Sequence, residues 1–324
     1  MKSSQKISFI CFFCINLLIS TVFADEIKTD LAMRFQDKNN DLLADRPIDS
    51  SKLIDPYTLV FGTVPSHSFM FKKGAKEALK KHLQKVIGKQ VEFFPYQTNA
   101  AELEAMRSGM LHIAGMNTGS VPSAVNCAGF HLFAMTARED GDYGYTMQLI
   151  TYPGSGINNV SDLKGKTLLF TSDSSNSGHK APVAILKEKF KLIEGVDYNS
   201  RFSGNHGKSV LQVATREFKV AAVASGFTNA MELDERIPKS SFKMIYESET
   251  FPSTGYGYSH KLKPALAKKI ELAFKTFRWR DTPQSSPKAF NKFNQTQFIS
   301  ANYKKMWGII RTIDKANGIS YECK

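Results

Sequence analysis

The chain has 324 residues, of which 42% are hydrophobic and 23% are charged, and its formal net charge is +13. A globular protein of this length and composition is large enough for two lobes with buried cores. The positive charge favours anionic partners. However, no basic run alternates with aromatic residues and no nucleic-acid-binding motif occurs, so the sequence argues against nucleic acid as a partner.

The first 24 residues have the layout of a cleavable secretory signal. Lys2 and Lys6 precede an apolar stretch from Ile7 to Phe23, and the segment closes with Val22-Phe-Ala24. These flanks and this length favour a signal peptide over a retained membrane helix. We therefore expect export to the periplasm, and loss of the two lysines lowers the net charge to +11.

Residues 25–56 form a polar N-terminal extension without sustained periodicity. Four oxygen-bearing side chains occupy alternate and nearby positions of one short stretch: Asp37, Asn39, Asp41 and Asp45. This spacing is that of the first part of a calcium-binding loop. Leu42 replaces the usual glycine and no glutamate closes the loop. A structural calcium ion and a plain solvated turn both remain open.

Strand and helix signals alternate from Tyr57 onward. The pattern predicts strands at Leu59–Gly62, Val91–Phe94 and His112–Gly115, and helices at Phe69–Val86, at Ala100–Arg107 and from Ser120. Apolar segments follow at Phe130–Thr136 and Tyr145–Tyr152. Such alternation with short connections is typical of an α/β fold.

The passage Pro153–Gly156 precedes a second alternating unit. After Val160–Leu163, the pattern predicts strands at Lys166–Thr171, Arg201–Phe202, Lys219–Ala224 and Phe242–Tyr246, and helices at Val183–Phe190, Lys208–Arg216 and Thr228–Asp234. A Gly/Pro-marked passage, Phe251–Tyr258, then leads to two helices without strands of their own, Pro264–Phe277 and Asn302–Asn317.

Cys127 and Cys323 are the two cysteines beyond the signal segment. In an exported chain they predict a disulfide, with two free thiols as the alternative. The bond would place the C-terminal helices on the lobe that contains Cys127. We therefore expect lobe 1 over residues 57–152, lobe 2 over 153–250, and a return to lobe 1 over 251–324. The chain would cross near 150–156 and 250–257, and a ligand would sit between hinged lobes.

The strongest candidate binding segment is Thr171–Pro182, between a predicted strand and a predicted helix. Hydroxyl groups, backbone N–H groups and the positive end of a helix dipole converge there, which suits an oxyanion. The candidate ligands are Ser175, Asn176, Ser177 and Gly178. The alternative is that one of these serines only caps the helix.

Further strand-to-helix junctions repeat this arrangement. Gly115–Ser120 precedes Val121-Pro122, and its candidate ligands are Asn117, Thr118 and Ser120. Asn205–Ser209 contains His206, which could donate to an oxyanion or serve only the local fold. Two more junctions, at Ser66–Ser68 and Gln97–Asn99, carry weaker signals. Facing helix starts in the two lobes favour an anion clamp over coincidental caps.

Catalytic and metal-binding motifs do not occur in the sequence. There is no G-x-S-x-G elbow, no H-E-x-x-H motif and no phosphate-binding G-x-x-x-x-G-K-[ST] loop. We therefore expect no catalysis, and no cofactor other than the possible calcium ion.

Several segments occur in one order over about residues 58 to 280: Phe61–Pro65, Glu104–Ala114, Asn117–Ser120, Ser175–Gly178 with Pro182, Gly204–His206 and Val220–Ala222. Together they resemble the periplasmic phosphonate/phosphite-binding proteins of ABC transporters. The resemblance implies a two-lobed, type II-like periplasmic binding protein with a hinge between the lobes. It implies a protein that passes a phosphonate, phosphite or phosphate-like anion to an inner-membrane permease, and that holds the phosphorus oxygens at the serine-rich turn. We also expect the protein to be a monomer.

One position departs from part of this family. Members that bind an aminoalkylphosphonate carry an acid where this chain has Lys219, and a lysine facing the cleft would repel the ammonium group of such a ligand. If Lys219 faces away, the position is uninformative. Two other classes stay open: an exported hydrolase of phosphonate or phosphate esters, and a receptor or sensor for another small anion such as a carboxylate or sulfonate.

Overall fold

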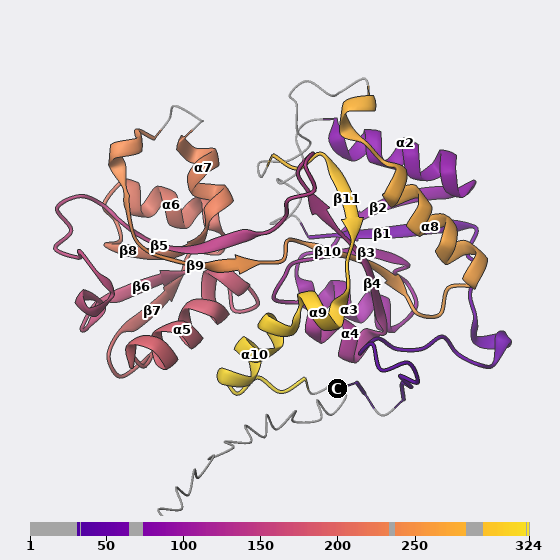
Figure 1. The fold of residues 1–324 in the computed structure, drawn as a ribbon, viewed down its shortest axis with the longest axis horizontal. Coiled ribbons are helices and arrows are strands. Elements are labelled where there is room, and N and C mark those ends of the chain that lie inside the picture. Colours follow the sequence, from indigo (N-terminus) through magenta and orange to yellow (C-terminus); the bar gives the residue numbers. More distant parts are fainter. Residues whose placement is uncertain are drawn as a thin grey trace, which may run out of the picture. The chain divides into compact units, whose positions relative to one another are not determined.

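The computed structural model describes residues 31–32, 34–64, 74–232, 237–282, 294–321 and 323. The predicted signal segment and the junction Ser66–Ser68 lie outside these residues. Two mixed β-sheets organise the described chain, and we call each sheet with the helices that cover it a lobe (Figure 1). None of the helices in these ranges is long and apolar enough to span a membrane.

Lobe 1 contains a six-stranded sheet with the strand order β11-β4-β10-β3-β1-β2. Its strands are β1 (Thr58–Thr63), β2 (Gln90–Pro95), β3 (Ile113–Met116), β4 (Phe130–Ala137), β10 (Gly255–Ser259) and β11 (Gln297–Ser300). β1 is parallel to β2 and β3, whereas β10 and β11 are antiparallel to β4. The parallel strands therefore end at one edge of the sheet, which is where ligands bind in such folds.

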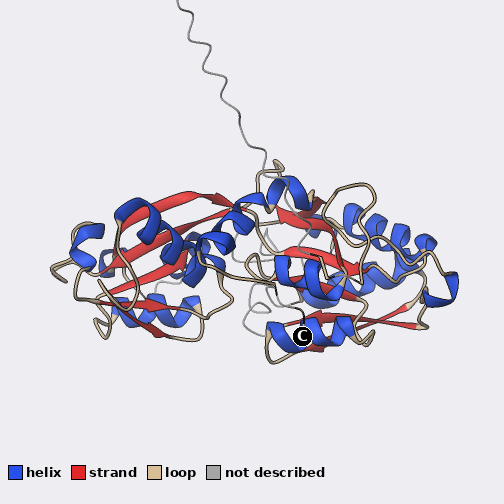
Figure 2. Cartoon of the chain, turned by 90° about the horizontal axis from the view of Figure 1, so that it is seen from below, coloured by secondary structure: helices blue, strands red, loops and turns tan. Residues whose placement is uncertain are grey.

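Helices cover both faces of this sheet (Figures 1 and 2). α2 (Ala75–Ile87) and α8 (Pro264–Thr276) pack together on one face, and α3 (Asn99–Arg107) and α4 (Val121–Ala128) lie on the other. The buried residues of α2 recur at helical spacing: Ala75, Ala78, Leu79, Leu83 and Ile87. The helix ends at Gly88, whose φ of 76° is a left-handed conformation that glycine adopts without strain.

Lobe 2 contains a five-stranded sheet with the order β7-β6-β8-β5-β9. Its strands are β5 (Tyr145–Thr151), β6 (Thr167–Phe170), β7 (Asn199–Phe202), β8 (Val220–Ala224) and β9 (Lys243–Phe251). The helical segments are η2 (Val160–Leu163), η3 (Asn176–Lys180), α5 (Ala181–Phe190), α6 (His206–Ala214), α7 (Ser225–Glu232) and η4 (Lys239–Ser241). β6 is parallel to β7 and β8, and β5 is antiparallel to β8 and β9.

The central strand β8 is buried along its whole length. Val220 and Ala222 belong to the same hydrophobic cluster as residues of α5, whereas Ala221 and Val223 pack with residues of α6 and α7. Successive side chains of a strand point to opposite faces, so a continuous apolar run is needed where both faces are covered. This explains why Lys219–Ala224 could be predicted as a strand.

The first crossing between the lobes differs from the prediction. β5 pairs with β8 and β9, so Tyr145–Thr151 belongs to lobe 2 and the chain crosses at residues 138–144 rather than near 150–156. The sequence of an apolar strand does not show which of two sheets it belongs to, because that depends on the strands with which it pairs. The return crossing follows β9 at residues 252–254, within the predicted range. Gly144 has a φ of 89°, and a Cβ there would lie 2.4 Å from the backbone oxygen of Phe251.

The passage Phe251–Tyr258 is not only a connection, because the central strand β10 begins within it. Its glycines allow close packing: a Cβ on Gly255 would lie 2.7 Å from Leu132, and one on Gly257 would lie 2.5 Å from Phe130. Because glycine has a low β-propensity, the sequence did not predict β10 as a strand, although its close packing requires glycine. β11, which joins the edge of the sheet beside β4, was also missed.

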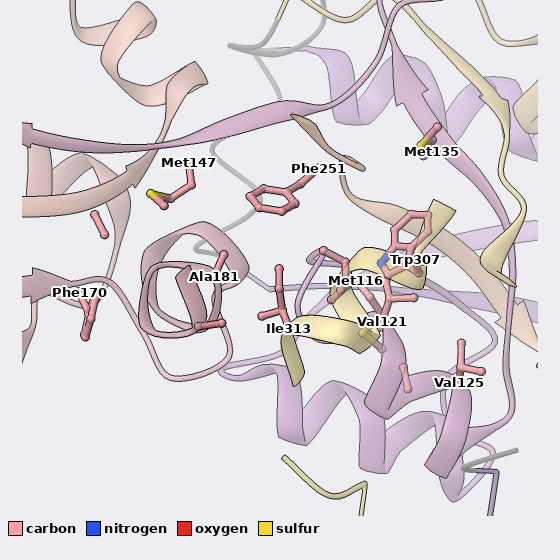
Figure 3. Packing of buried hydrophobic residues seen from close by; sticks show 14 of the residues in the cluster. Met116, Val121, Val125, Met135, Met147, Phe170, Ala181, Phe251, Trp307 and Ile313 are labelled. Atoms are coloured by element: carbon pink, nitrogen blue, oxygen red, sulfur yellow. The ribbon is translucent and has the colours of Figure 1, made fainter. Parts of the chain in front are cut away.

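The C-terminal helices were predicted to pack on lobe 1, and this holds for only part of them. The chain continues from α8 through the short turn η5 (Trp279–Asp281) to β11. Two helices follow, α9 (Tyr303–Met306) and α10 (Gly308–Ala316), where the sequence predicted one. α10 packs against η3 and α5 of lobe 2, and Ile313 shares a hydrophobic cluster with Ala181 (Figure 3). Cys127 and Cys323 form the predicted disulfide, so the end of the chain returns to lobe 1.

The predicted calcium turn precedes the short helical turn η1 (Ser50–Lys52). The Asp37 carboxylate accepts hydrogen bonds from the backbone N–H groups of Asp41 and Leu42, and Asp45 accepts one from Lys38. Leu42 has a φ of 67°, the left-handed conformation that glycine would adopt there. Within the described ranges no group of three or more His, Cys, Asp or Glu side chains could hold a metal ion. The calcium site stays a prediction.

Candidate functional site

A cavity of about 90 Å³ lies where the two lobes meet. One water molecule occupies about 30 Å³ in the liquid, and pockets for drug-sized ligands begin near about 300 Å³. The cavity therefore suits a small ligand. Its lining comes from the ends of strands in both lobes and from both crossing segments, which is where the predicted clamp would lie.

The serine-rich turn of lobe 2 lines one side of the cavity through Ser175, Asn176 and Ser177. Ser175 is the N-cap of η3, and its Oγ accepts a hydrogen bond from Gly178 N at 3.1 Å. Capping and cavity-lining, which were alternatives at first, thus coexist in one residue. Since η3 continues directly into α5, the positive end of a long helical segment points toward the cavity.

Gly178 lies just outside the lining and supports the turn instead. Its backbone oxygen accepts from Thr171 N at 2.9 Å, while its N–H is taken by Ser175. The bond from Lys180 N to Ser175 O, at 3.0 Å, spans five residues and gives the turn its wide π-helical form. Such wide turns are frequent at functional sites.

Two buried polar atoms of the lining have no hydrogen-bond partner among the described residues. They are Oγ1 of Thr171 and Oδ1 of Asn176, and each residue is 2% exposed. A buried polar atom without a partner costs about 1–3 kcal/mol. The cavity is therefore built for a polar occupant.

The second predicted turn, in lobe 1, lines the cavity through Asn117 and Thr118. Asn117 Oδ1 accepts from Ser120 N at 2.8 Å, which shapes the turn, and Thr118 Oγ1 donates to the backbone oxygen of Pro252 at 2.8 Å. Ser120 is buried on the same turn but does not line the cavity. Its predicted contact with the ligand therefore has no support from the geometry.

His206 reaches the same cavity from the start of α6. Its Nδ1 accepts from Ala224 N at 3.2 Å, so the proton of the neutral ring is on Nε2. Nε2 lies 3.3 Å from Ser175 Oγ, which also accepts from Gly178 N. Both lone pairs of that hydroxyl are then in use, so its own proton can only be donated to another acceptor. Ser175 therefore offers the cavity a hydrogen-bond donor.

Several lining residues were not named as candidate ligands. Thr171, Ser172 and Asn205 lie within the predicted junctions, and the residues outside them are Gly144, Tyr145, Gly204, Ala224, Phe227, Ser253, Thr254 and Gln295. Ala224 and Phe227 could have been found, because β8 and α7 form another strand-to-helix junction. The crossing residues could not, because no local pattern shows which strands separate the lobes.

The character of the lining is neutral. Among the cavity residues that the structure describes there is no Asp, Glu, Lys or Arg. Phe227 stacks on His206 with ring centroids 4.7 Å apart, which gives one wall an apolar face. Burial raises the pKa of the Tyr145 hydroxyl, so it stays protonated, and Asn176 Nδ2 donates to it at 3.3 Å.

Lys219 does not face this cavity. It is exposed and precedes β8, whereas Ala224 at the other end of that strand lines the cavity. The residue therefore says nothing about the charge of the ligand. The weaker junction at Gln97–Asn99 lies outside the lining as well, but Asn99 Nδ2 donates to Ser174 Oγ of lobe 2 at 3.1 Å.

The chain matches a known family over most of its length. Residues 61–307 match the family described as the periplasmic phosphonate substrate-binding protein of an ABC transporter. The chain is 22% identical over 293 residues to the phosphate-import protein PhnD of Mycolicibacterium smegmatis, covering 86% of this chain and 89% of that protein.

Two solved structures share the two-lobed fold. One is a binding protein component of an ABC phosphonate transporter from Pseudomonas aeruginosa, with a TM-score of 0.67, 20% identity, and coverage of 83% of this chain and 90% of that one. The other is PhnD1 from Prochlorococcus marinus in complex with methylphosphonate, with a TM-score of 0.66, 17% identity, and coverage of 82% and 100%.

Proposed function

Since this chain belongs to the periplasmic substrate-binding proteins of phosphonate ABC transporters, we propose that its interlobe cavity captures a small phosphorus oxyanion for an inner-membrane permease. The family is one of transport proteins that act outside the cytoplasm. For this chain we propose further that residues 1–24 are a cleaved signal peptide. The mature protein would act as a monomer, would not bind nucleic acid and would not turn over its ligand.

The observation that carries this proposal is the convergence of two turns on one cavity. Asn117 and Thr118 come from lobe 1, and Ser175, Asn176 and Ser177 come from lobe 2. Helix starts stand behind both turns, so fixed dipoles favour a negative guest. The obligatory donor at Ser175 and the unpartnered Thr171 hydroxyl suit the oxygen acceptors of such a ligand. Asn176 Oδ1 can only accept, so it suits a protonated oxygen of the ligand.

The neutral lining suggests which phosphorus oxyanion fits. An aminoalkylphosphonate needs a carboxylate for its ammonium group, and no carboxylate lines the described part of the cavity. An apolar wall at Phe227 suits a hydrogen or a methyl group instead. We therefore propose phosphite or methylphosphonate as the preferred ligand. One relative is described in complex with methylphosphonate and another as a phosphate importer, which fits this size class.

A panel of thermal shifts tests the proposal against the other small anions. The mature protein is heated with phosphite, methylphosphonate, 2-aminoethylphosphonate, phosphate, sulfate and acetate in turn. A ligand that binds the folded state raises the melting temperature in proportion to occupancy. The largest shift is expected with phosphite or methylphosphonate, and a shift with acetate or sulfate alone would contradict the proposal.

A hydrolase is separated from a binding protein by following the ligand itself. Phosphorus NMR of methylphosphonate and of a phosphate monoester, incubated with the protein, is expected to show unchanged ligand. Release of inorganic phosphate would favour the hydrolase instead.

A further inference from the structure

Lys180 lies at a junction of three parts of the molecule. It belongs to lobe 2, at the end of the segment η3 that begins with the serine-rich turn. Its buried Nζ lies 2.8 Å from the backbone oxygen of Gly119 in lobe 1 and 3.0 Å from Oδ1 of Asp314 on α10. One ammonium group thus connects lobe 2 with lobe 1 and with the C-terminal helix.

Asp314 holds this ammonium group in place. The residue is 1% exposed, and its Oδ2 accepts a hydrogen bond from the Tyr321 hydroxyl at 2.8 Å. Asn317 Nδ2 donates to the backbone oxygen of Lys180 at 2.8 Å, so α10 contacts both the side chain and the backbone of that lysine. Two fixed contacts on one side leave the ammonium group directed at Gly119.

The covalent path returns to the same turn. α10 leads through Tyr321 to Cys323, which is bonded to Cys127 on α4. α4 is the helix that begins directly after the turn Asn117–Ser120, so the disulfide, Asp314 and Lys180 form one closed ring around that turn. The ring has two non-covalent links, both made by Lys180, and displacing Lys180 from Gly119 would break one of them.

The Lys180 contact lies where the two anion-binding turns touch. A Cβ on Gly119 would lie 2.4 Å from the backbone oxygen of Ser174 and 2.9 Å from Asn176 N. Contact this close between the turns requires the lobes to be together. A charged donor that bridges the turns at this point therefore favours the closed arrangement over an open one.

We propose that Lys180 is a positioning residue that holds the lobe 1 turn against the lobe 2 turn when the lobes close on a ligand, with Asp314 orienting it. The inference rests on the proposed function, because it assigns these turns to the ligand. The apparent affinity for the ligand decreases when a smaller fraction of the molecules can close. Loss of one charge-assisted hydrogen bond is expected to weaken methylphosphonate or phosphite binding about tenfold to a hundredfold.

The test compares three variants of the mature protein by calorimetry and by stopped-flow dissociation. Lys180→Met removes the donor, and Lys180→Met with Asp314→Asn also removes the charge that would otherwise be left buried and unpaired. Lys187→Met is the matched control, because Lys187 also reaches from lobe 2 to α10, at Ala316 O, and not to the lobe 1 turn.

The double variant is expected to melt close to the wild type yet to bind weakly and release its ligand faster. Lys187→Met is expected to bind like the wild type. Wild-type affinity in the double variant, or equal losses in the double variant and in Lys187→Met, would overturn the proposal.

Failure of the proposed function has a different signature. If the wild type binds neither methylphosphonate nor phosphite, the radius of gyration from small-angle scattering still tests the link between the turns. A larger radius of gyration for the ligand-free double variant than for the ligand-free wild type supports the link. Equal radii overturn it.

Discussion

Gly178 packs so closely on Thr171 that a Cβ at position 178 would lie 1.9 Å from Thr171 Oγ1. Thr171 lines the cavity and Gly178 supports the turn that carries Ser175. The glycine is therefore required by space rather than by backbone conformation. Any side chain at 178 must move the wall of the cavity.

Gly178→Ala is expected to weaken ligand binding at least tenfold, because the added methyl group displaces Thr171 from the wall of the cavity. Overpacking of this kind also lowers fold stability by about 1–3 kcal/mol. Calorimetric titration measures the effect. Gly207→Ala serves as the control, since its Cβ would meet only Asn205 Oδ1, at 3.4 Å. Equal affinities for the two variants would contradict the assigned role of Gly178.

Ser175→Ala removes the hydroxyl that has only its proton left to donate. If that proton goes to a charged phosphorus oxygen, binding is expected to weaken by about 1.5–3 kcal/mol. Ser177→Ala tests a second hydroxyl of the same turn. A similar weakening of ligand binding is expected if this hydroxyl contacts the anion. Ser161→Ala, at an exposed position of η2, controls for general effects of the substitution. Unchanged affinity in Ser175→Ala would leave this serine as a helix cap only.

Glu102 is predicted to make stability depend on pH. It is fully buried, both of its carboxylate oxygens are without partners among the described residues, and burial raises its pKa to about 8. The folded state thus binds a proton that the unfolded state releases near pH 4.5. The contribution of Glu102 to stability is therefore fully present below that pH and is lost as the pH rises toward 8.

Glu102→Gln removes this titration. The free energy of unfolding of this variant, relative to that of the wild type, is expected to rise between pH 4.5 and pH 8. By pH 7 it should have risen by roughly 3 kcal/mol. Urea unfolding across this range measures the difference. Glu104→Gln, on the exposed face of the same helix, is expected to show no such trend. A pH-independent difference for Glu102→Gln would contradict the prediction.

The Cys127–Cys323 bond is expected to stabilise the fold strongly. It closes a loop with a sequence separation of 196, and loop entropy alone predicts a contribution of roughly 5 kcal/mol for a loop of this size. Replacing both cysteines by serine should lower the melting temperature by several degrees, as should a reductant acting on the wild type. Identical melting curves with and without reductant would argue against the bond in solution.

Much of the fold and part of the site could be predicted because local signals were strong. The junctions at Asn117–Thr118 and Ser175–Ser177 each follow an apolar strand and precede a helix, whereas His206 begins a helix after a short polar strand. The structure places all three around one cavity. Glycine, hydroxyl groups and helix periodicity are short-range features, so a single sequence displays them. Their convergence followed from the shared edge of parallel strands.

The remaining features depend on long-range packing. The partners of β5 decided which lobe contains Tyr145, and close packing on Phe130 explained why a central strand contains Gly257. The position of α10 across the lobes depends on Ile313 and Asp314, whose partners lie more than a hundred residues earlier in the chain. No local pattern contains that information.

Turns from both lobes are expected to hold the same phosphorus oxyanion. A crystal structure of the mature protein with methylphosphonate measures this most directly. We expect phosphonyl oxygens within hydrogen-bond distance of the turns at Asn117–Thr118 and at Ser175–Ser177, with the methyl group toward Phe227. A ligand bound away from both turns, or held by only one lobe, would contradict it.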